Sequence, residues 1–431
     1  MSTLTARILE DFARSERARP SSAVAAARRR AAIETLQAHG LPGPRDENWK
    51  YANLRPLERL RFVPAAVAQP PAAPADLAAL PAAIAGFARY LFVDGVLAPA
   101  GSATLTATAA AITPLSQAST AEGGGSERAD ERFALLNLAF ATDGVAIRVP
   151  AAPDPVCLEL LYVAGADAET GACYPRVELE LDAAASLVLI ERHVSAGAKP
   201  SFVTSAVTVA LGRGARLEHY RLQDLNARTT LFDTLTASLA QHARYRLHAI
   251  STGTQSARST ISVCLAGEHA DLALAVAALG DRQQVADTYA VVEHAAPRAR
   301  TVQTFRGIAA GRARVAFNGK IVVASNAHGT DSQQSLRGLL AGPEAEIDVR
   351  PQLEIYTDEV RCSHGATAGK LDENMLFYLL SRGLTPAAAQ RLLKWAFLED
   401  VIAQFTVPEL RRQIEEHLAG ALGDEALKEL L

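Results

Sequence analysis

The sequence predicts a mainly β protein, in which a solenoid of repeated coils lies between helical N-terminal and C-terminal segments. From Val145 to about Val360, apolar and polar residues alternate with a period of two, which is typical of half-buried strands. After Gly369, the apolar residues recur with the period of about 3.6 that is typical of helices. Within the alternating part, an alanine-led motif recurs at intervals of 27 to 32 residues, with one gap of 14. Its copies begin at Ala185, Ala215, Ala243, Ala270, Ala299, Ala313 and Ala345.

This repeat indicates how the strands stack. A unit that recurs at a near-constant spacing is typical of solenoids, in which each coil packs on its neighbours. Because one gap is half of the others, we expect each coil to contain two long strands and the motif to begin either one. The copy at Ala299 is the weakest, since Thr301 and Gln303 stand where apolar residues are expected. The pattern alone leaves a β-helix and a β-sandwich open.

The N-terminal segment is expected to consist mostly of helix over residues 1–39. Ser22 is a suitable cap for a helix that begins at Ala23, and Gly40 is a suitable residue to end it. Acidic residues interrupt its arginines, which favours the solvated face of a helix over a transit peptide. Trp49 and Tyr51 follow, and we interpret them as an anchor that packs this segment on the main body.

The middle of the chain alternates connecting stretches with strands. Residues 64–86, rich in Ala and Pro, predict a linker, and residues 117–131 predict a mobile loop. A short helix is expected at 133–140. No helical pattern that could serve as a crossover separates the strands after it. The clearest strands are expected at 156–163, 177–181, 187–190, 217–222 and 315–323.

Three helices are expected after the strands. Thr385 followed by Pro386 is a typical N-cap with proline at the first helical position, and Pro408 opens another helix in the same way. The apolar residues of this part cover more than one helix face, which is a plausible docking surface. The expected helices span 372–381, 385 to about 405, and 408 to near 431. The expected domains are a helical region with linker at 1–86, a β-helix core at 87–368 and a helical domain at 369–431.

Composition excludes several classes of protein. The net charge is −4 with interspersed charges, so no nucleic-acid partner is expected. No apolar run approaches the roughly 18 residues of a membrane span, so no membrane partner is expected either. The four cysteines, at 157, 173, 264 and 362, have no paired spacing, which favours a reducing cytoplasm over a disulfide framework. There is no phosphate-binding loop of the Gly-x-x-x-x-Gly-Lys-Ser/Thr type, so any ATPase activity would belong to another subunit.

The candidate chemistry is concentrated at Cys362 and His364. If a strand runs through both, the thiol and the imidazole project from one face. Such a pair can bind a metal or take part in sulfur or proton chemistry. Gly365 and Gly369 are expected to turn the backbone into the next helix. A buried cysteine beside a turn-capping histidine is the structural alternative.

The residues around this pair carry a resemblance to a known family. The run Pro-Gln-Leu-Glu-Ile-Tyr-Thr-Asp-Glu-Val-Arg-Cys-Ser-His-Gly-Ala-Thr-Ala-Gly at 351–369, continued by Leu-Phe-Tyr-Leu-Leu-Ser-Arg-Gly at 376–383, resembles the SufB/SufD family of iron–sulfur cluster assembly proteins. Four scattered cysteines favour its SufD branch over SufB, whose chains tend to be longer and to carry more cysteines. The chain departs from the family at His328-Gly329, where a basic pair is usual, which leaves any role of that pair in doubt.

The resemblance implies a fold, partners and a site. The fold would be a right-handed parallel β-helix flanked by helical segments. The chain would be a non-enzymatic scaffold that pairs with a SufB-like paralogue through about residues 320–364 and with the ATPase SufC through about 385–431, or forms a homodimer when isolated. It would bind no cofactor tightly alone, because the iron–sulfur cluster is transient and shared with the partner. His364 would be the candidate cluster or iron ligand, and Cys362 a second candidate for sulfur or metal.

Two further residues and two rival functions complete the expectations. Asp358 and Glu359 lie just upstream, and alternation would place Asp358 on the face of Cys362, where a carboxylate could fix the tautomer of a nearby histidine. A thiol-dependent enzyme that uses Cys362 with His364 is one rival, although no third orienting group is evident. A polysaccharide-active β-helix enzyme is the other, although no pair of carboxylates recurs at the coil spacing.

Overall fold

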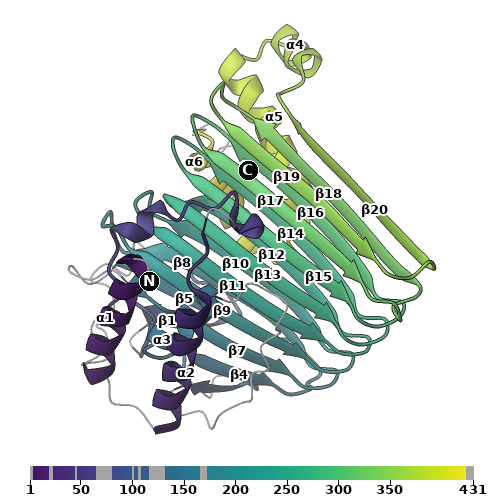
Figure 1. Cartoon of the computed structure of the whole chain (residues 1–431). Coiled ribbons are helices and arrows are strands. Elements are labelled where there is room, and N and C mark those ends of the chain that lie inside the picture. The colour runs from purple at the N-terminus through teal and green to yellow at the C-terminus, as the bar shows by residue number, and fades with distance from the viewer. Residues whose placement is uncertain are drawn as a thin grey trace.

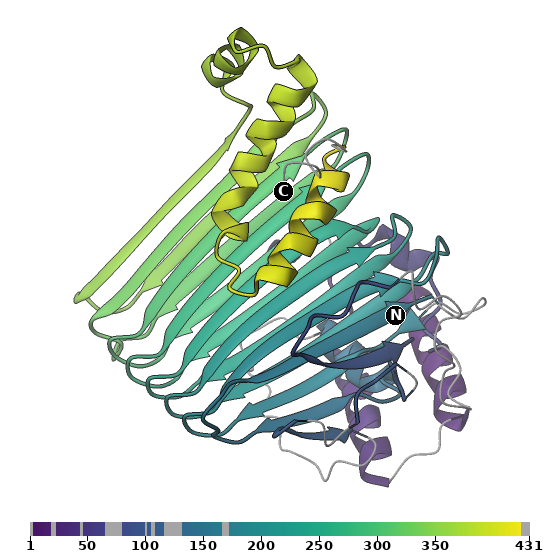
Figure 2. The same ribbon diagram turned by 180° about the vertical axis from the view of Figure 1, so that it is seen from behind.

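The computed structural model describes residues 3–18, 23–43, 46–64, 80–99, 101–104, 108–115, 132–165 and 172–423. Most of them form one long solenoid of strands (Figure 1). N-terminal helices cover one broad face of the solenoid, and C-terminal helices cover the opposite face (Figure 2). No helix in the described ranges is long and apolar enough to cross a membrane.

Two ten-stranded sheets make up the solenoid, and the chain passes from one to the other at almost every turn. The first sheet has the order β2 (Val96–Ala98), β1 (Ala88–Val93), β5 (Val156–Ala164), β8 (Ser186–Ser195), β10 (Arg216–Leu225), β12 (Arg244–Gly253), β14 (Asp271–Gly280), β16 (Arg300–Ala309), β18 (Thr330–Leu340) and β20 (Val360–Gly369). The second has the order β19 (Glu346–Ile355), β17 (Arg314–Val323), β15 (Val285–His294), β13 (Ser256–Leu265), β11 (Thr230–Leu239), β9 (Phe202–Leu211), β7 (Arg176–Leu181), β4 (Val145–Val149) and β3 (Ala111–Pro114), with β6 (Ala172–Cys173) also on β9. From β5 onward the neighbours in the first sheet pair in parallel, as each coil requires. This arrangement confirms the β-helix and excludes the sandwich.

The alanine repeat marks the coils as predicted. Ala185, Ala215, Ala243, Ala270 and Ala299 are fully buried and stand directly before β8, β10, β12, β14 and β16. The copies at Ala313 and Ala345 precede β17 and β19 instead, so the motif begins strands of either sheet. The predicted strands at 156–163, 177–181, 187–190, 217–222 and 315–323 are also confirmed.

The solenoid is filled by side chains that alternate inward along both sheets. In β10 and β11, for example, Leu217 and Leu235 belong to one apolar column that continues to Leu336 in β18. Burial of each such side chain contributes about 1.5–3 kcal/mol. Thr301 and Gln303, which weaken the repeat at Ala299, are also fully buried. The interior near the C-terminal end therefore also contains polar side chains.

The N-terminal segment packs on the outer face of the second sheet. It consists of α1 (Thr3–Ala18), α2 (Ala23–His39), two short 3₁₀ turns (Glu47–Trp49 and Arg55–Glu58) and α3 (Arg132–Phe140), which contacts β9 and β11. Trp49 is buried against Phe133, with ring centroids 5.1 Å apart, and the Arg258 guanidinium lies 4.5 Å from the Trp49 ring. The predicted anchor at Trp49 is therefore confirmed. The expected loop at 117–131 lies outside the described residues.

The C-terminal helices are α4 (Glu373–Ser381), α5 (Pro386–Ile402) and α6 (Pro408–Ala421). Helices α5 and α6 pack on the outer face of the first sheet, whereas α4 contacts α5 and buries none of its residues. Asp372 caps α4, and the Thr385 hydroxyl accepts the Ala388 N–H at the start of α5, as predicted. Helix α5 ends before the expected residue 405, because the chain must turn before Pro408 opens α6. The end expected for α6 near 431 lies outside the described residues.

The expected turn at Gly365 and Gly369 is wrong. Strand β20 continues through Gly365 to Gly369, and neither glycine has a positive φ. Pairing with β18 over this whole length keeps the backbone extended. The turn into α4 comes only after Gly369, and Asp372 caps the helix there.

Interior burial makes the stability of the solenoid depend on pH. His294 is fully buried, its Nε2 lies 2.9 Å from the Thr301 hydroxyl, and burial lowers its pKa from 6.5 to about 4. The unfolded chain therefore takes up a proton that the folded chain does not accept, so stability falls as pH falls from ~6.5 to ~4. The full loss is on the order of 3 kcal/mol. In denaturant unfolding across this window, we expect His294→Gln to lose less stability than the wild type, and an equal loss would contradict this account.

Candidate functional site

Among the described residues, no strand pairs with either outer sheet edge at the C-terminal end of the solenoid. Strand β20 pairs there with β18 alone, and strand β19 with β17 alone. In Figure 1, β20 runs along the outer margin of the solenoid and leads to α4. Unpaired backbone groups along such an edge are available to another strand.

Cys362 and His364 both lie on β20, as predicted, and project from the same face of that strand. In the parallel register Cys362 lies beside Ser332 and His364 beside Gln334, whose side chains point into the solenoid. Cys362 is half-buried and packs against the interior apolar column, whereas His364 is exposed. Burial raises the pKa of the Cys362 thiol, although the neighbouring Ser332 side chain partly offsets the effect. The edge thus presents one protonated thiol and one accessible imidazole.

The other residues predicted for this site lie in neighbouring turns. Asp358 and Glu359 belong to the bend before β20, so strand alternation does not place Asp358 beside Cys362 as expected. The Gly329 N–H, in the turn before β18, donates to the Glu359 carbonyl at 2.6 Å. His328 is exposed in that same turn. The coil corner thus ends at Gly329, and strand β18 follows.

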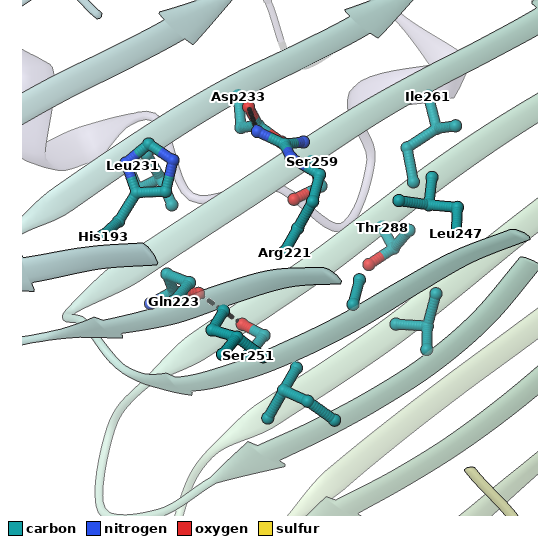
Figure 3. Close-up of a pocket in the computed structure, with 14 residues that line it drawn as sticks. His193, Arg221, Gln223, Leu231, Asp233, Leu247, Ser251, Ser259, Ile261 and Thr288 are labelled. Carbon is teal, nitrogen blue, oxygen red and sulfur yellow. Dashed lines mark hydrogen bonds and ion pairs between the residues drawn. The ribbon is translucent and has the colours of Figure 1, made fainter. Parts of the chain in front are cut away.

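A charged cluster inside the solenoid was not expected from the sequence. Arg221 donates to Asp233 through Nη1 at 2.6 Å and to Glu191 through Nη2 at 2.9 Å. His193 Nε2 and His219 Nε2 lie 2.7 and 3.2 Å from the same Glu191 carboxylate. All five side chains are buried. Figure 3 shows Arg221 reaching across to Asp233 at the edge of a small cavity.

The electrostatics of this cluster are dominated by Arg221. Burial opposes ionisation of Glu191, but Arg221 and the two histidines outweigh it and hold the pKa of Glu191 well below its usual range. Burial lowers the pKa of His219, although Glu191 partly offsets the effect. The cavity beside the cluster has a volume of about 40 Å³. That is room for a few water molecules.

The coil spacing contains the signal that could have identified this cluster. His193 and His219 show no metal-ligand spacing in the sequence. Glu191 and Arg221, however, are direct neighbours in the register of β8 and β10, one coil apart. A buried ion pair in a solenoid requires two residues of opposite charge at inward-facing positions of neighbouring coils, and Glu191 and Arg221 meet this requirement.

Large apolar side chains are exposed only in the last part of the described chain. Helix α4 buries none of its residues, and Phe377 is 73% exposed. A second group, at the opposite end of β20, contains Tyr356, which is 63% exposed. The full set of exposed large apolar residues within the described ranges is Ile355, Tyr356, Met375, Phe377, Tyr378 and Leu392.

No group of three or more His, Cys, Asp or Glu side chains is arranged to hold a metal ion in the portions of the chain that the structure describes. The four cysteines lie on four different strands, β5, β6, β13 and β20.

Comparison with known proteins gives consistent matches. A family model described as "SUF system FeS cluster assembly, SufBD core domain" matches residues 163–397. The "Iron-sulfur cluster assembly protein SufD" of Escherichia coli is 31% identical over 385 residues, which are 89% of each chain. An iron–sulfur cluster assembly SufBD family protein of Synechocystis is 27% identical over 90% of this chain and 89% of its own. A chloroplastic protein of Arabidopsis thaliana, ABCI7, is 28% identical over 58% of this chain and 53% of its own.

Proposed function

The chain belongs to the SufBD family of iron–sulfur cluster assembly proteins, and from this premise we propose that it is a SufD-like scaffold subunit. It works in the cytoplasm within a complex of the SufBCD type. The cluster is its cargo and is not a resident cofactor. The observation that carries the proposal is that β20 brings Cys362 and His364 to one face of an unpaired sheet edge.

The SufB-like paralogue pairs with this chain at the edge formed by β19 and β20. Both strands have ten residues, and each leaves one side of its backbone unpaired. A strand of a second protein can continue either sheet there. The exposed Ile355 and Tyr356 lie where β19 turns toward β20 and add apolar contact. In the absence of the paralogue, a second copy of this chain can use the same edge.

The SufC-like ATPase binds the C-terminal helices. Helix α4 presents Met375, Phe377 and Tyr378 to solvent, an apolar surface that a partner would cover. The sequence has no phosphate-binding loop of its own, so the nucleotide belongs to the partner. Because β20 leads directly into α4, a nucleotide-dependent movement of the helices would reach the strand that carries Cys362 and His364.

At the shared interface His364 acts as a cluster or iron ligand and Cys362 as a second sulfur or metal site. Asp358 and Glu359 shape the adjoining turn, in which Glu359 accepts the Gly329 N–H. A cluster held only by thiolates needs several cysteines, and this edge supplies one. The remaining ligands therefore come from the partner chain.

The two rival functions have less support. An enzyme thiol needs a lowered pKa, whereas burial raises the pKa of Cys362. A polysaccharide-active enzyme needs two carboxylates that face a cleft, whereas Glu191 and Asp233 are buried and paired with Arg221.

The test is anaerobic co-expression with the SufB-like and SufC-like partners, followed by iron and sulfide analysis of the purified complex. We expect the His364→Ala complex to assemble normally but to bind the cluster much more weakly. Substitution of a residue that supports a metal ligand lowers metal affinity by ~10–100-fold, so loss of the ligand itself should lower the affinity by at least as much. His328→Ala, which removes an exposed histidine from the neighbouring turn, is the matched control and should keep its cluster. A His364→Ala complex with full iron and sulfide would remove His364 from the site and leave the chain a scaffold alone.

A further inference from the structure

Two buried amide side chains form a ladder just inside the C-terminal end of the solenoid. Gln334 Nε2 donates to Gln303 Oε1 at 3.1 Å and to the Gly319 carbonyl at 3.2 Å. Gln303 is fully buried and Gln334 is 4% exposed. Gly319 makes room for the ladder, because a Cβ there would lie 2.9 Å from Gln334 Nε2 and 3.0 Å from Gln303 Oε1.

This ladder fixes the orientation of the Gln334 amide. Both hydrogens of Nε2 are used, and a flipped amide would place its oxygen against the Gly319 carbonyl, where two acceptors would face each other. Among the described residues, the Gln334 Oε1 atom is then buried without a hydrogen-bond partner, as is the Nε2 atom of Gln303. An unsatisfied buried acceptor is unfavourable, so a nearby donor that can reach this oxygen should occupy it.

Besides Gln303, the position of β18 places another donor next to this oxygen. Gln303 lies on β16, on one side of β18, and takes the Nε2 end of the Gln334 amide. On the other side lies β20, where His364 occupies the same register position as Gln334 and faces the same way. His364 is exposed, so its ring can rotate toward the amide. An imidazole carries at least one N–H in either of its ordinary protonation states.

We propose that Gln334 is a positioning residue for His364. Its Oε1 accepts an N–H from the imidazole, which orients the ring and leaves the second nitrogen of the neutral ring with a free lone pair toward the open end of the solenoid. A hydrogen bond of this kind is how ligand histidines are commonly oriented. Only the use of the free nitrogen as a ligand rests on the proposed function; the hydrogen bond belongs to the chain alone.

The experiment is proton–nitrogen NMR of the full-length chain with ¹⁵N-labelled histidine, at a pH about two units above the ordinary imidazole pKa of ~6.5. His364→Gln assigns the His364 signal by difference. We expect an observable ring N–H of His364 in the wild type, since a hydrogen bond to a buried acceptor slows its exchange with water. Gln334→Met should lose the signal, and Gln334→Glu, which keeps an acceptor, should retain it. Gln333→Met, on the exposed neighbouring side chain, is the matched control and should change nothing.

Each outcome decides the proposal. A wild-type His364 ring N–H that exchanges too fast to observe overturns it, as does a signal that persists in Gln334→Met. If Gln334→Met does not fold, the wild-type spectrum decides by itself. The cluster content of the His364→Ala complex is a separate measurement. A protected N–H together with a full cluster in that complex would uphold the positioning of His364 and reject its role as a ligand.

Discussion

Replacement of Arg221 by methionine is expected to destabilise the protein by about 3–5 kcal/mol, the usual result of removing one partner from a buried ion pair. Arg221 is the one cation that donates to both Glu191 and Asp233 within the interior cluster of described residues. Methionine fills a similar volume, so the loss measures charge and not a cavity. Urea and thermal unfolding of the full chain at neutral pH would measure it.

The stability lost in Arg221→Met should depend on pH in a definite direction. Without Arg221, burial is the dominant influence on Glu191 and favours its protonated form. Since the unfolded chain ionises at the ordinary carboxyl pKa, the penalty is present at neutral pH and shrinks as pH falls toward ~4. The wild type behaves in the opposite way, because the lowered pKa of Glu191 contributes stability that is lost as pH falls.

Two further variants separate this account from a general effect of losing an arginine. Arg246 pairs with Asp271 at 2.8 Å, and its side chain is 37% exposed, so Arg246→Met should cost no more than about 1 kcal/mol. The triple variant Arg221→Met, Glu191→Gln, Asp233→Asn removes the stranded charges and should recover most of the stability. Equal losses in Arg221→Met and Arg246→Met would contradict the predicted role of the buried cluster.

The sequence identifies the coils well because their signal is local and repeated. Each alanine copy marks the start of a strand. If one copy were assigned to the wrong residue, the regular spacing of the neighbouring copies would reveal the mistake. The cluster around Glu191 could not be read in this way, since it joins His193 to Asp233 across the interior through two sheets. Such residues become neighbours only when the strands of successive coils are aligned residue by residue. That alignment can be made only when the ends of the strands are known.

At the C-terminal site, too, the sequence prediction was limited by unknown strand ends. Alternation placed Cys362 and His364 on one face correctly, because both lie within one strand. It failed for Asp358, since the strand begins only at Val360. The turn expected at Gly365 from the conformational freedom of glycine is absent, since pairing with β18 extends the strand beyond the histidine. Strand ends depend on the neighbouring coil and not on the local residues alone, which is why they are the weakest part of a sequence prediction. Gln334 escaped notice for a related reason, because nothing in its own segment shows that it is buried.

The second large effect is expected at helix α4, where Phe377→Asp should weaken binding of the SufC-like ATPase by roughly 2 kcal/mol or more, about thirty-fold. Phe377 is the most exposed large apolar side chain in the described ranges, and α4 buries none of its residues. The substitution should therefore leave the melting temperature unchanged. A binding titration with the purified ATPase subunit, such as isothermal calorimetry, measures the effect.

Tyr356→Asp supplies the crossed control for this measurement. Tyr356 is also well exposed, but it lies in the turn at the other end of β20 from α4. Because the two positions would face different partners, Tyr356→Asp should weaken pairing with the SufB-like paralogue and leave ATPase binding unchanged, and Phe377→Asp should do the reverse. A loss of both partners in either variant would mean that the two surfaces act as one, and a loss of neither would reject both docking assignments. The crossed pattern would instead establish that β20 connects two separate interfaces, with Cys362 and His364 between them.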